Sequence, residues 1–214
     1  LTPLPLKLEL LAELGLDQTF VIPFNQELAS LSADDFAKDV LADGLGASAI
    51  LVGYDFAYGK GRSGTPTTLQ AEGKKLGFGV DIVEPVEEDG AVFASRDIRE
   101  HLRLGEVREA AEELGYWWRV KGVVEKGHGR GKNLGFPTIN LALKPGQDVG
   151  YGIYAMRVFH NGRRYPAAGY VGASPTFGGG VPMFEAYLLD FDGDLYGKEV
   201  EIEFIAKLRD DKAF

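Results

Sequence analysis

The sequence predicts two domains, an α/β domain with a parallel sheet followed by an all-β domain with an antiparallel barrel. Helical and strand-like segments alternate over roughly the first half of the chain, which indicates βαβ units. From Tyr116 onward this pattern gives way to short strands separated by turn residues. The 214 residues are enough for two small cores, because 45% of them are hydrophobic and only 26% are charged.

The elements of the first half follow from local patterns. Residues 5–14 place leucines at helical spacing before Gly15, which predicts an amphipathic helix. Thr19–Phe24 is a run of β-branched and aromatic residues, which predicts a buried strand. The further elements expected are helices at 32–44 and 68–76, strands at 49–53 and 78–83, a helix that opens at 95–99, and a charged helix at 103–114 that links the two domains.

The second half predicts about six antiparallel strands, a number that suits a closed barrel. Asn161-Gly162 and Asp192-Gly193 are turn sequences between strands. The expected strands lie near residues 117–125, 138–142, 151–160, 163–172, 182–190 and 198–206.

Composition limits the possible partners and the location. The net charge of −9 and the pI near 4.9 argue against nucleic acid as the main partner, because binding the phosphate backbone needs a basic surface. The chain has no cysteine, no signal peptide and no apolar run long enough for a membrane span. We therefore expect a cytoplasmic protein with no membrane partner, and the sequence does not indicate its oligomeric state. Because the chain begins at Leu1 instead of Met, we also expect residues to be missing at its start.

A glycine-rich basic segment at 127–132 predicts a phosphate-binding loop. Glycines let successive backbone N–H groups turn inward around an anion. The alternative is a flexible hairpin loop. The residues expected to contact phosphate are Gly127, Gly129, Gly131 and Lys132.

Thr138 and Asn140 directly follow this segment and predict a magnesium site. Phe136 and Pro137 stiffen the chain before them, and residues two apart in an extended segment point to one face. Mg²⁺ prefers oxygen ligands and completes its shell with water and nucleotide phosphates. The alternative is that this segment only opens a strand.

Three further positions are candidates on residue chemistry. The loop after strand 49–53 combines aromatic rings able to stack on a flat heterocycle with a carboxylate and glycine hinges, although glycine-rich loops of this kind are also common on surfaces. Its candidate residues are Asp55, Phe56, Tyr58 and Gly59. Ser95 and Arg99 in the first turn of a helix could hold a phosphate, or could be an ordinary helix start with solvated charges. Glu185 lies in a mostly apolar strand, where a carboxylate is costly unless it is exposed, paired or used.

The run Gly131–Asn140, of the form G-x-x-L-G-F-P-T-x-N, resembles the signature of riboflavin kinases. The resemblance implies that the Pro-Thr-x-Asn element binds Mg²⁺ and ATP, and that Glu185 is the catalytic base. It also implies that Arg209 lies in a loop that closes over the flavin. Pro175–Gly178 and Leu195–Gly197 match the same family.

Residues 53–64 and 95–99 resemble the second half of the nucleotidyltransferase module that bacteria fuse to riboflavin kinase, and the fused enzyme makes FMN and then FAD. The resemblance implies that Asp55, Phe56, Tyr58 and Gly59 contact flavin and that Ser95 and Arg99 contact ATP phosphates. Three positions depart from the family pattern, namely Tyr58, Ala94 and Arg96. The His-x-Gly-His motif of that module does not occur in this chain, whose histidines are His101, His128 and His160.

The resemblances together imply a partial Rossmann-like FMN adenylyltransferase domain at 1–115 and a six-stranded Greek-key riboflavin kinase barrel at 116–214. The implied partners are riboflavin, FMN and ATP, with Mg²⁺ as cofactor. One alternative is a monofunctional riboflavin kinase whose first domain is an inactive scaffold. Another is a non-catalytic flavin- or nucleotide-binding protein.

Overall fold

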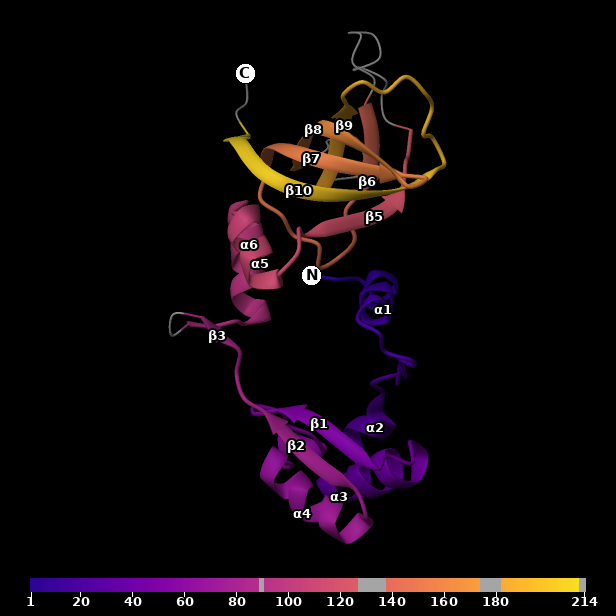
Figure 1. Ribbon diagram of the computed structural model, residues 1–214, viewed down its shortest axis with the longest axis vertical. Helices are drawn as coiled ribbons and strands as arrows, with labels where there is room; N and C mark the ends of the chain where they lie inside the picture. The colour runs from indigo at the N-terminus through magenta and orange to yellow at the C-terminus, as the bar shows by residue number, and fades with distance from the viewer. Residues whose placement is uncertain (89–90, 127–137, 174–181, 212–214) are drawn as a thin grey trace. The chain divides into compact units, whose positions relative to one another are not determined.

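The computed structural model describes residues 1–88, 91–126, 138–173 and 182–211 (Figure 1). The chain divides into two compact units, one formed by Leu1–Gln18 with Ala94–Phe214 and the other by Thr19–Phe93. Packing therefore groups the first helix and residues 94–115 with the barrel. The functional boundary expected at residue 115 stays a prediction, because it concerns activity and not packing.

The unit formed by Thr19–Phe93 is built on a two-stranded parallel sheet. Its elements are α2 (Gln26–Ser30), α3 (Ala33–Asp35), the π-helical segment η1 (Phe36–Gly44), β1 (Ala49–Gly53), the 3-10 turn η2 (Lys60–Arg62), α4 (Pro66–Leu76), β2 (Gly79–Val83), β3 (Glu87–Glu88) and β4 (Ala91–Val92). In β1 and β2, Ala49 lies opposite Gly79 and Gly53 lies opposite Val83, so the parallel pairing is confirmed. Two strands do not make the larger Rossmann-like sheet, which stays a prediction.

Both predicted helices of this unit are present, and each has a defined start. The Ser32 hydroxyl accepts a hydrogen bond from the Asp35 N–H at 3.0 Å, and the helix then continues as η1. The Thr65 hydroxyl accepts from the Thr68 N–H at 3.2 Å, and the Thr68 hydroxyl accepts from the Thr65 N–H at 2.8 Å. This reciprocal cap starts α4 at Pro66, two residues before the expected start.

The predicted strand at Thr19–Phe24 is wrong. The segment forms no strand, and Phe20 and Phe24 are 64% and 83% exposed. A strand needs a neighbour to pair its backbone N–H and C=O groups, and in the described part of the chain the parallel sheet contains only β1 and β2. Apolar composition alone was therefore not sufficient to form a strand here.

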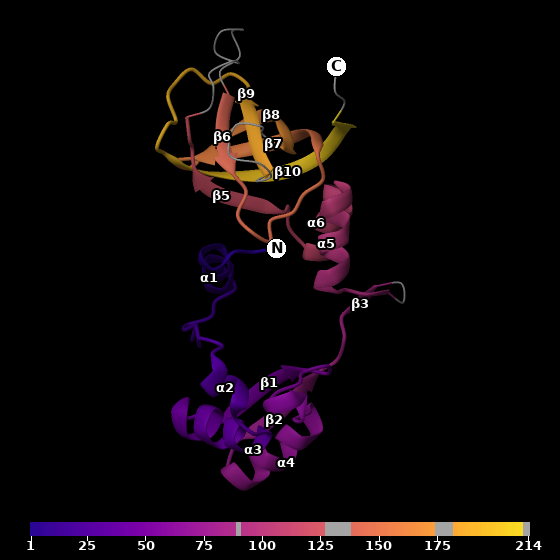
Figure 2. The same ribbon diagram turned by 180° about the vertical axis from the view of Figure 1, so that it is seen from behind.

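The other unit holds the barrel. Its elements are α1 (Leu4–Glu13), α5 (Ser95–Leu104), α6 (Val107–Leu114), β5 (Arg119–Val123), β6 (Thr138–Ala142), β7 (Gly152–His160), β8 (Arg163–Ala173), β9 (Pro182–Leu188) and β10 (Glu199–Asp210). The six predicted strands are confirmed within a few residues. They form one sheet in the order β5-β10-β7-β8-β9-β6. Strands β6 to β9 of this sheet can be followed in Figure 2.

The connectivity of this sheet is a Greek key. Strands β7, β8 and β9 follow one another, and β10 returns to lie beside β7. The two end strands approach each other, because the Glu125 N–H donates to the Asn140 carbonyl at 2.9 Å across the seam. The predicted barrel is thus nearly closed.

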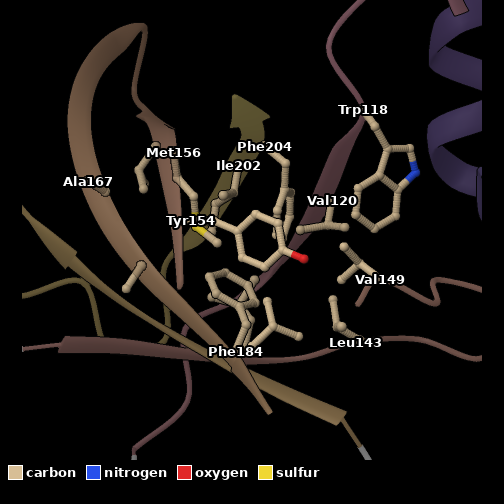
Figure 3. Close-up of a cluster of buried hydrophobic side chains, with 14 of the residues drawn as sticks. Trp118, Val120, Leu143, Val149, Tyr154, Met156, Ala167, Phe184, Ile202 and Phe204 are labelled. Atoms are coloured by element: carbon tan, nitrogen blue, oxygen red, sulfur yellow. The ribbon is translucent and has the colours of Figure 1, made fainter. Parts of the chain in front are cut away.

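Alternate residues of each strand fill the inside of this barrel. Trp118, Tyr154, Phe184 and Phe204 are all fully buried, and Figure 3 shows these rings pointing toward one another. Phe204 contacts the other three rings, with centroid separations of 5.1 to 6.2 Å. The odd-numbered residues of β8 and the even-numbered residues of β9 point inward. The even-numbered residues of β8 and the odd-numbered residues of β9 therefore face outward.

The predicted helix at 103–114 is interrupted. Helix α5 ends at Leu104, Gly105 takes a left-handed conformation with φ +80°, and α6 begins at Val107. A Cβ at Gly105 would lie 2.6 Å from both the Lys207 Cδ and the Tyr154 hydroxyl, so the glycine is needed both for its conformation and for close packing on the barrel. Val107 belongs to the barrel core, as its inward position in the expected helix predicted, and the role of 103–114 as the link between the two domains stays a prediction.

His101 joins the two helices through a pair of carboxylates. Its Nδ1 lies 2.7 Å from Glu106 Oε2 and its Nε2 lies 3.2 Å from Glu113 Oε1. The hydrogen bond to Glu106 and the nearby charge of both glutamates raise the pKa of His101, although partial burial opposes this. When the ring is protonated, it links α5 to α6 through these two carboxylates.

Within the described residues, no helix is both long and apolar enough to cross a membrane.

Candidate functional site

Three polar side chains form a row across the outer face of the barrel. Asn140 on β6 lies directly opposite Glu185 on β9, and Glu185 lies directly opposite Tyr170 on β8. Directly opposed residues in an antiparallel sheet share a face. Their strand neighbours Leu141, Phe184 and Val171 are buried in the core, so this row faces outward.

Thr138 stands beside the row on the same face, two residues before Asn140. It lies opposite Tyr187 on β9. The two residues of the predicted magnesium site are therefore brought together as expected, and Glu185 is added to them by the pairing of β6 with β9. Sequence reasoning proposed Glu185 separately and did not anticipate that it pairs with Asn140.

Asn140 and Glu185 differ sharply in exposure. Asn140 is only 4% exposed although it points outward, whereas Glu185 is exposed. Asn140 is also fixed from both sides, because β9 pairs with it along one edge and the Glu125 N–H binds its carbonyl along the other. The site thus combines a rigid amide with a carboxylate that is accessible to a substrate.

A cavity of about 160 Å³ adjoins Thr138 at the start of β6. Most of its lining residues are apolar or aromatic, and Asp194 contributes a carboxylate. It is lined by Val124, Thr138, Ile139, Leu188, Phe191, Gly193, Asp194, Leu195 and Tyr196. A flat ring fits such walls better than a charged group does.

Tyr170 was not singled out from the sequence. Its hydroxyl donates a hydrogen bond to Asp211 Oδ2 at 3.0 Å. Burial, this hydrogen bond and the neighbouring carboxylates, Glu185 among them, raise its pKa, so the hydroxyl stays protonated. Strand pairing is the signal that identifies Tyr170, and a single sequence does not give the register of strands.

Arg209 lies in β10, so the expectation that it sits in a loop is wrong. It is the second-last residue of the strand and is paired with Ile153 on β7. Ile153 is in turn paired with Tyr170, which places Arg209 on the extension of the outer-face row. A role for Arg209 in flavin binding stays a prediction.

The predicted phosphate loop, with Gly127, Gly129, Gly131 and Lys132, lies outside the described residues. The family-like segment Pro175–Gly178 also lies outside them. The described part of the site therefore consists of β6, β8, β9 and the end of β10.

The donor set at β6 fits a hard dication. Thr138 offers a hydroxyl oxygen and Asn140 an amide oxygen on one face, and the Glu185 carboxylate is opposite Asn140. In the described part of the chain no cluster of three or more His, Cys, Asp or Glu side chains suits a metal ion. Mg²⁺ suits a small set of oxygens of this kind because it retains water and takes phosphate oxygens from a nucleotide.

The second candidate site lies in the loop after β1. Asp55 follows the strand end, and the Phe56 N–H donates to the Gly53 carbonyl at 3.1 Å in a tight turn. Tyr58 is only 5% exposed and stacks on Phe56 with a ring separation of 5.5 Å and an interplanar angle of 15°. Tyr58 is thus part of the core of this unit and supports the loop from within.

Gly59 fixes the other end of that loop. Its φ of +71° is left-handed, and a Cβ there would lie 2.6 Å from the Ala33 nitrogen. Only glycine fits this close approach. The assignment of Asp55, Phe56, Tyr58 and Gly59 to flavin binding stays a prediction.

Ser95 is the first residue of α5 and Arg99 lies one turn further along it, so a helix opens at 95–99 as predicted. Both are exposed, and the Arg99 guanidinium donates to the Ser95 carbonyl at 2.9 Å. Ala94 precedes the helix and supplies no side-chain cap. The Asp97 and Ile98 N–H groups donate to the Ala94 carbonyl at 2.9 and 3.3 Å, and phosphate binding at this helix start stays a prediction.

Two family models match the chain. The riboflavin kinase (flavokinase) model matches residues 114–214 and the FAD synthetase model matches residues 1–97. The first covers the barrel with its outer-face row. The second covers the loop after β1 together with Ser95, and ends two residues before Arg99.

Several curated relatives are similar over nearly the whole chain. The chain is 37% identical to the bifunctional riboflavin kinase/FMN adenylyltransferase of Pseudomonas fluorescens, over 94% of this chain and 65% of that protein. It is 33% identical to the Escherichia coli K12 protein of the same name, over 100% of this chain and 69% of that protein, and 34% identical to the Bacillus subtilis one, over 100% and 68%. The chain thus spans about two thirds of the length of these relatives.

A solved structure has a closely similar fold. It is titled as a macrolide-efflux protein from Streptococcus pneumoniae, has a TM-score of 0.89 and is 28% identical, over 100% of this chain and 69% of that one. By its relatives and its two family models, the chain belongs to the bifunctional riboflavin kinase/FMN adenylyltransferase family, which acts in flavin cofactor biosynthesis.

Proposed function

We propose that the barrel transfers the γ-phosphoryl group of Mg-ATP to the 5′-hydroxyl of riboflavin, with Glu185 as the general base. The observation that carries this proposal is the direct pairing of Asn140 with Glu185, with Thr138 on the same face. Phosphoryl transfer to an alcohol needs a phosphate-binding element, oxygen ligands for a metal ion and a base for the hydroxyl proton. The outer-face row brings the oxygen ligands and the base within the distance between two neighbouring strands.

Thr138 and Asn140 form the donor side of the site. Their side-chain oxygens would hold Mg²⁺, which when bound neutralises charge on the phosphates of ATP. Gly127, Gly129, Gly131 and Lys132 are proposed to hold the phosphates themselves. The cavity next to Thr138 supplies apolar walls within reach of the same strand, which supports nucleotide binding on this side.

Glu185 is proposed to act on the acceptor alcohol. Its carboxylate is exposed on the outer face, so a hydroxyl group can approach it directly. The buried amide of Asn140 next to it holds the donor side in position while Glu185 accepts the proton. A base within hydrogen-bonding distance of the hydroxyl is what the reaction requires.

The test is an assay of the chain with riboflavin, Mg²⁺ and ATP labelled at the γ-phosphorus. The proposal predicts label in FMN. Binding of riboflavin or ATP without formation of labelled FMN would favour the non-catalytic binding protein and refute the kinase. Riboflavin, FMN and ATP are the proposed small-molecule partners, and the cytoplasm is the proposed location.

A second candidate function is the adenylylation of FMN to FAD. It is supported by the FAD synthetase match to residues 1–97 and by the position of Ser95 at the start of α5, with Arg99 one turn further along the helix. ATP labelled at the α-phosphorus separates the possibilities, because adenylylation of FMN puts this label in FAD. A chain that makes labelled FMN from γ-labelled ATP but no labelled FAD would be a kinase with an inactive scaffold. The gene sequence ahead of the Leu1 codon will show whether a His-x-Gly-His motif is encoded there.

A further inference from the structure

We propose that Tyr170, fixed by Gly172 and Asp211, forms the acceptor side of the kinase site and contacts the alcohol substrate next to Glu185. This inference rests on the proposed function and deepens it. It assigns a substrate-positioning role to a residue that neither the sequence motifs nor the family matches single out.

The order of side chains along the outer-face row carries the first step. Glu185 lies between Asn140 on one strand and Tyr170 on the other, and neighbouring strands are about 4.8 Å apart. In phosphoryl transfer the attacking and leaving oxygens lie on opposite sides of the phosphorus. If the nucleotide is held on the Thr138 and Asn140 side of Glu185, the acceptor oxygen approaches from the side of Tyr170.

The position of the Tyr170 ring carries the second step. Gly172 lies two residues further along β8 on the same face, and a Cβ there would be 2.1 Å from the Tyr170 hydroxyl oxygen. The ring therefore lies flat across Gly172, where any other residue would displace it. The ring consequently runs along the sheet surface instead of projecting away from it.

The hydroxyl of Tyr170 carries the third step. It donates to Asp211 Oδ2 at 3.0 Å, and Asp211 directly follows the last residue of β10. This hydrogen bond fixes the ring at its far end and uses the single O–H donor, so the oxygen still offers a lone pair to a substrate hydroxyl. The ring face adds an apolar surface beside the base. A polyol chain joined to a flat heterocycle matches this combination of a ring surface and a hydrogen-bond acceptor.

A purely structural role for Tyr170 makes a different prediction. If it only fastened the end of β10 to β8, its loss would lower stability and affect both substrates alike or neither. Contact with the acceptor predicts a selective effect on riboflavin. The separation of the two Michaelis constants therefore distinguishes the two roles.

The experiment compares Tyr170→Ala and Tyr170→Phe in the full 214-residue chain. Steady-state kinetics give KM for riboflavin and for Mg-ATP, and the quenching of riboflavin fluorescence gives its Kd without turnover. Tyr165→Phe is the matched control, because Tyr165 is on the same strand but packs with the core and meets Phe191 edge-on at 5.1 Å.

Tyr170→Ala is expected to raise KM and Kd for riboflavin about tenfold or more, because the loss of one hydrogen bond and one ring contact weakens binding by this order. KM for Mg-ATP should stay within about twofold of the wild-type value. Tyr170→Phe should recover most of the affinity, and Tyr165→Phe should match the wild type. An unchanged riboflavin Kd in Tyr170→Ala, or an increase confined to Mg-ATP, would overturn the inference.

The kinase proposal can fail separately. If the wild-type chain binds riboflavin without phosphorylating it, the kinase fails while the riboflavin Kd of Tyr170→Ala still tests the contact. If the wild-type chain binds no riboflavin, both are overturned. Circular dichroism and Mg-ATP binding show whether each variant is folded. If Tyr170→Ala does not fold, Tyr170→Phe replaces it as the test variant. Its riboflavin Kd is then expected to rise measurably above that of Tyr165→Phe.

Discussion

Replacing Glu185 by Gln should abolish most of the kinase turnover without disturbing the barrel. The substitution keeps the shape of the side chain and removes only its ability to accept a proton. Glu185 is exposed, and its strand neighbours Phe184 and Ala186 keep their places in the core, so stability should change by no more than about 0.5 kcal/mol. Loss of a general base costs about 10² to 10⁴ in rate.

We expect kcat to fall at least about 100-fold, which corresponds to about 2.7 kcal/mol of transition-state stabilisation. KM for Mg-ATP should change little, because Thr138 and Asn140 remain. The assay is FMN formation under saturating riboflavin and Mg-ATP, with the melting temperature measured on the same samples. Glu109→Gln on the exposed face of α6 is the matched control and should behave as the wild type. Unchanged turnover in Glu185→Gln would refute the assignment of the base.

The remaining predictions concern the donor side and the helices. Thr138→Ala should raise KM for Mg-ATP severalfold while circular dichroism stays that of the wild type, and Thr138→Ser should restore the affinity; unfolding in Thr138→Ala would instead indicate a structural role. Because the pKa of His101 is raised in the folded chain, the protonated ring stabilises the fold fully below its ordinary pKa of about 6.5, and this stabilisation is lost as the pH rises through the raised pKa. The free energies of unfolding of wild type and His101→Gln, measured in urea, should therefore differ more at pH 5.5 than at pH 8.5. Equal differences at both pH values would contradict this. Gly105→Ala should lower the free energy of unfolding by about 2 to 4 kcal/mol, from left-handed backbone strain plus overlap of the new Cβ with the barrel. Gly115→Ala, at φ +75° with nothing within 4 Å of a Cβ there, should lower it by only about 1 to 2 kcal/mol. Equal melting temperatures of the two variants would contradict the overlap at Gly105.

The strands of the barrel could be predicted from the sequence because alternation and turn residues are local signals. The limits of β6 agree with the expected 138–142, and the turn Asn161-Gly162 joins β7 to β8 with φ of +48° and +72°. The shared face of Thr138 and Asn140 follows from the same local rule.

The assembly of the site could not be predicted in this way. Asn140 and Glu185 are far apart in sequence, and their pairing depends on the register of strands that meet only in the folded chain. Tyr170 was overlooked for the same reason. Arg209 was expected in a loop because the family resemblance implied one and the expected strand ended near 206, whereas β10 continues to Asp210.

The two errors in the first half have physical causes. Thr19–Phe24 has the composition of a buried strand but no partner strand beside it in the described structure, and composition alone does not reveal that. The break at Gly105 depends on how closely the helices approach Lys207 and Tyr154, which is a tertiary contact. Local propensity indicated one helix, and packing on the barrel separated it into two.

The most direct test of the kinase site is a crystal structure of the chain with Mn²⁺, ADP and riboflavin, in which anomalous scattering locates the metal. We predict a metal ion about 2.0 to 2.3 Å from the Thr138 hydroxyl and Asn140 amide oxygens, bridged to the nucleotide phosphates, with the riboflavin 5′-hydroxyl about 3 Å from the Glu185 carboxylate. A metal ion bound away from β6, or a riboflavin whose 5′-hydroxyl points away from Glu185, would contradict the assignment.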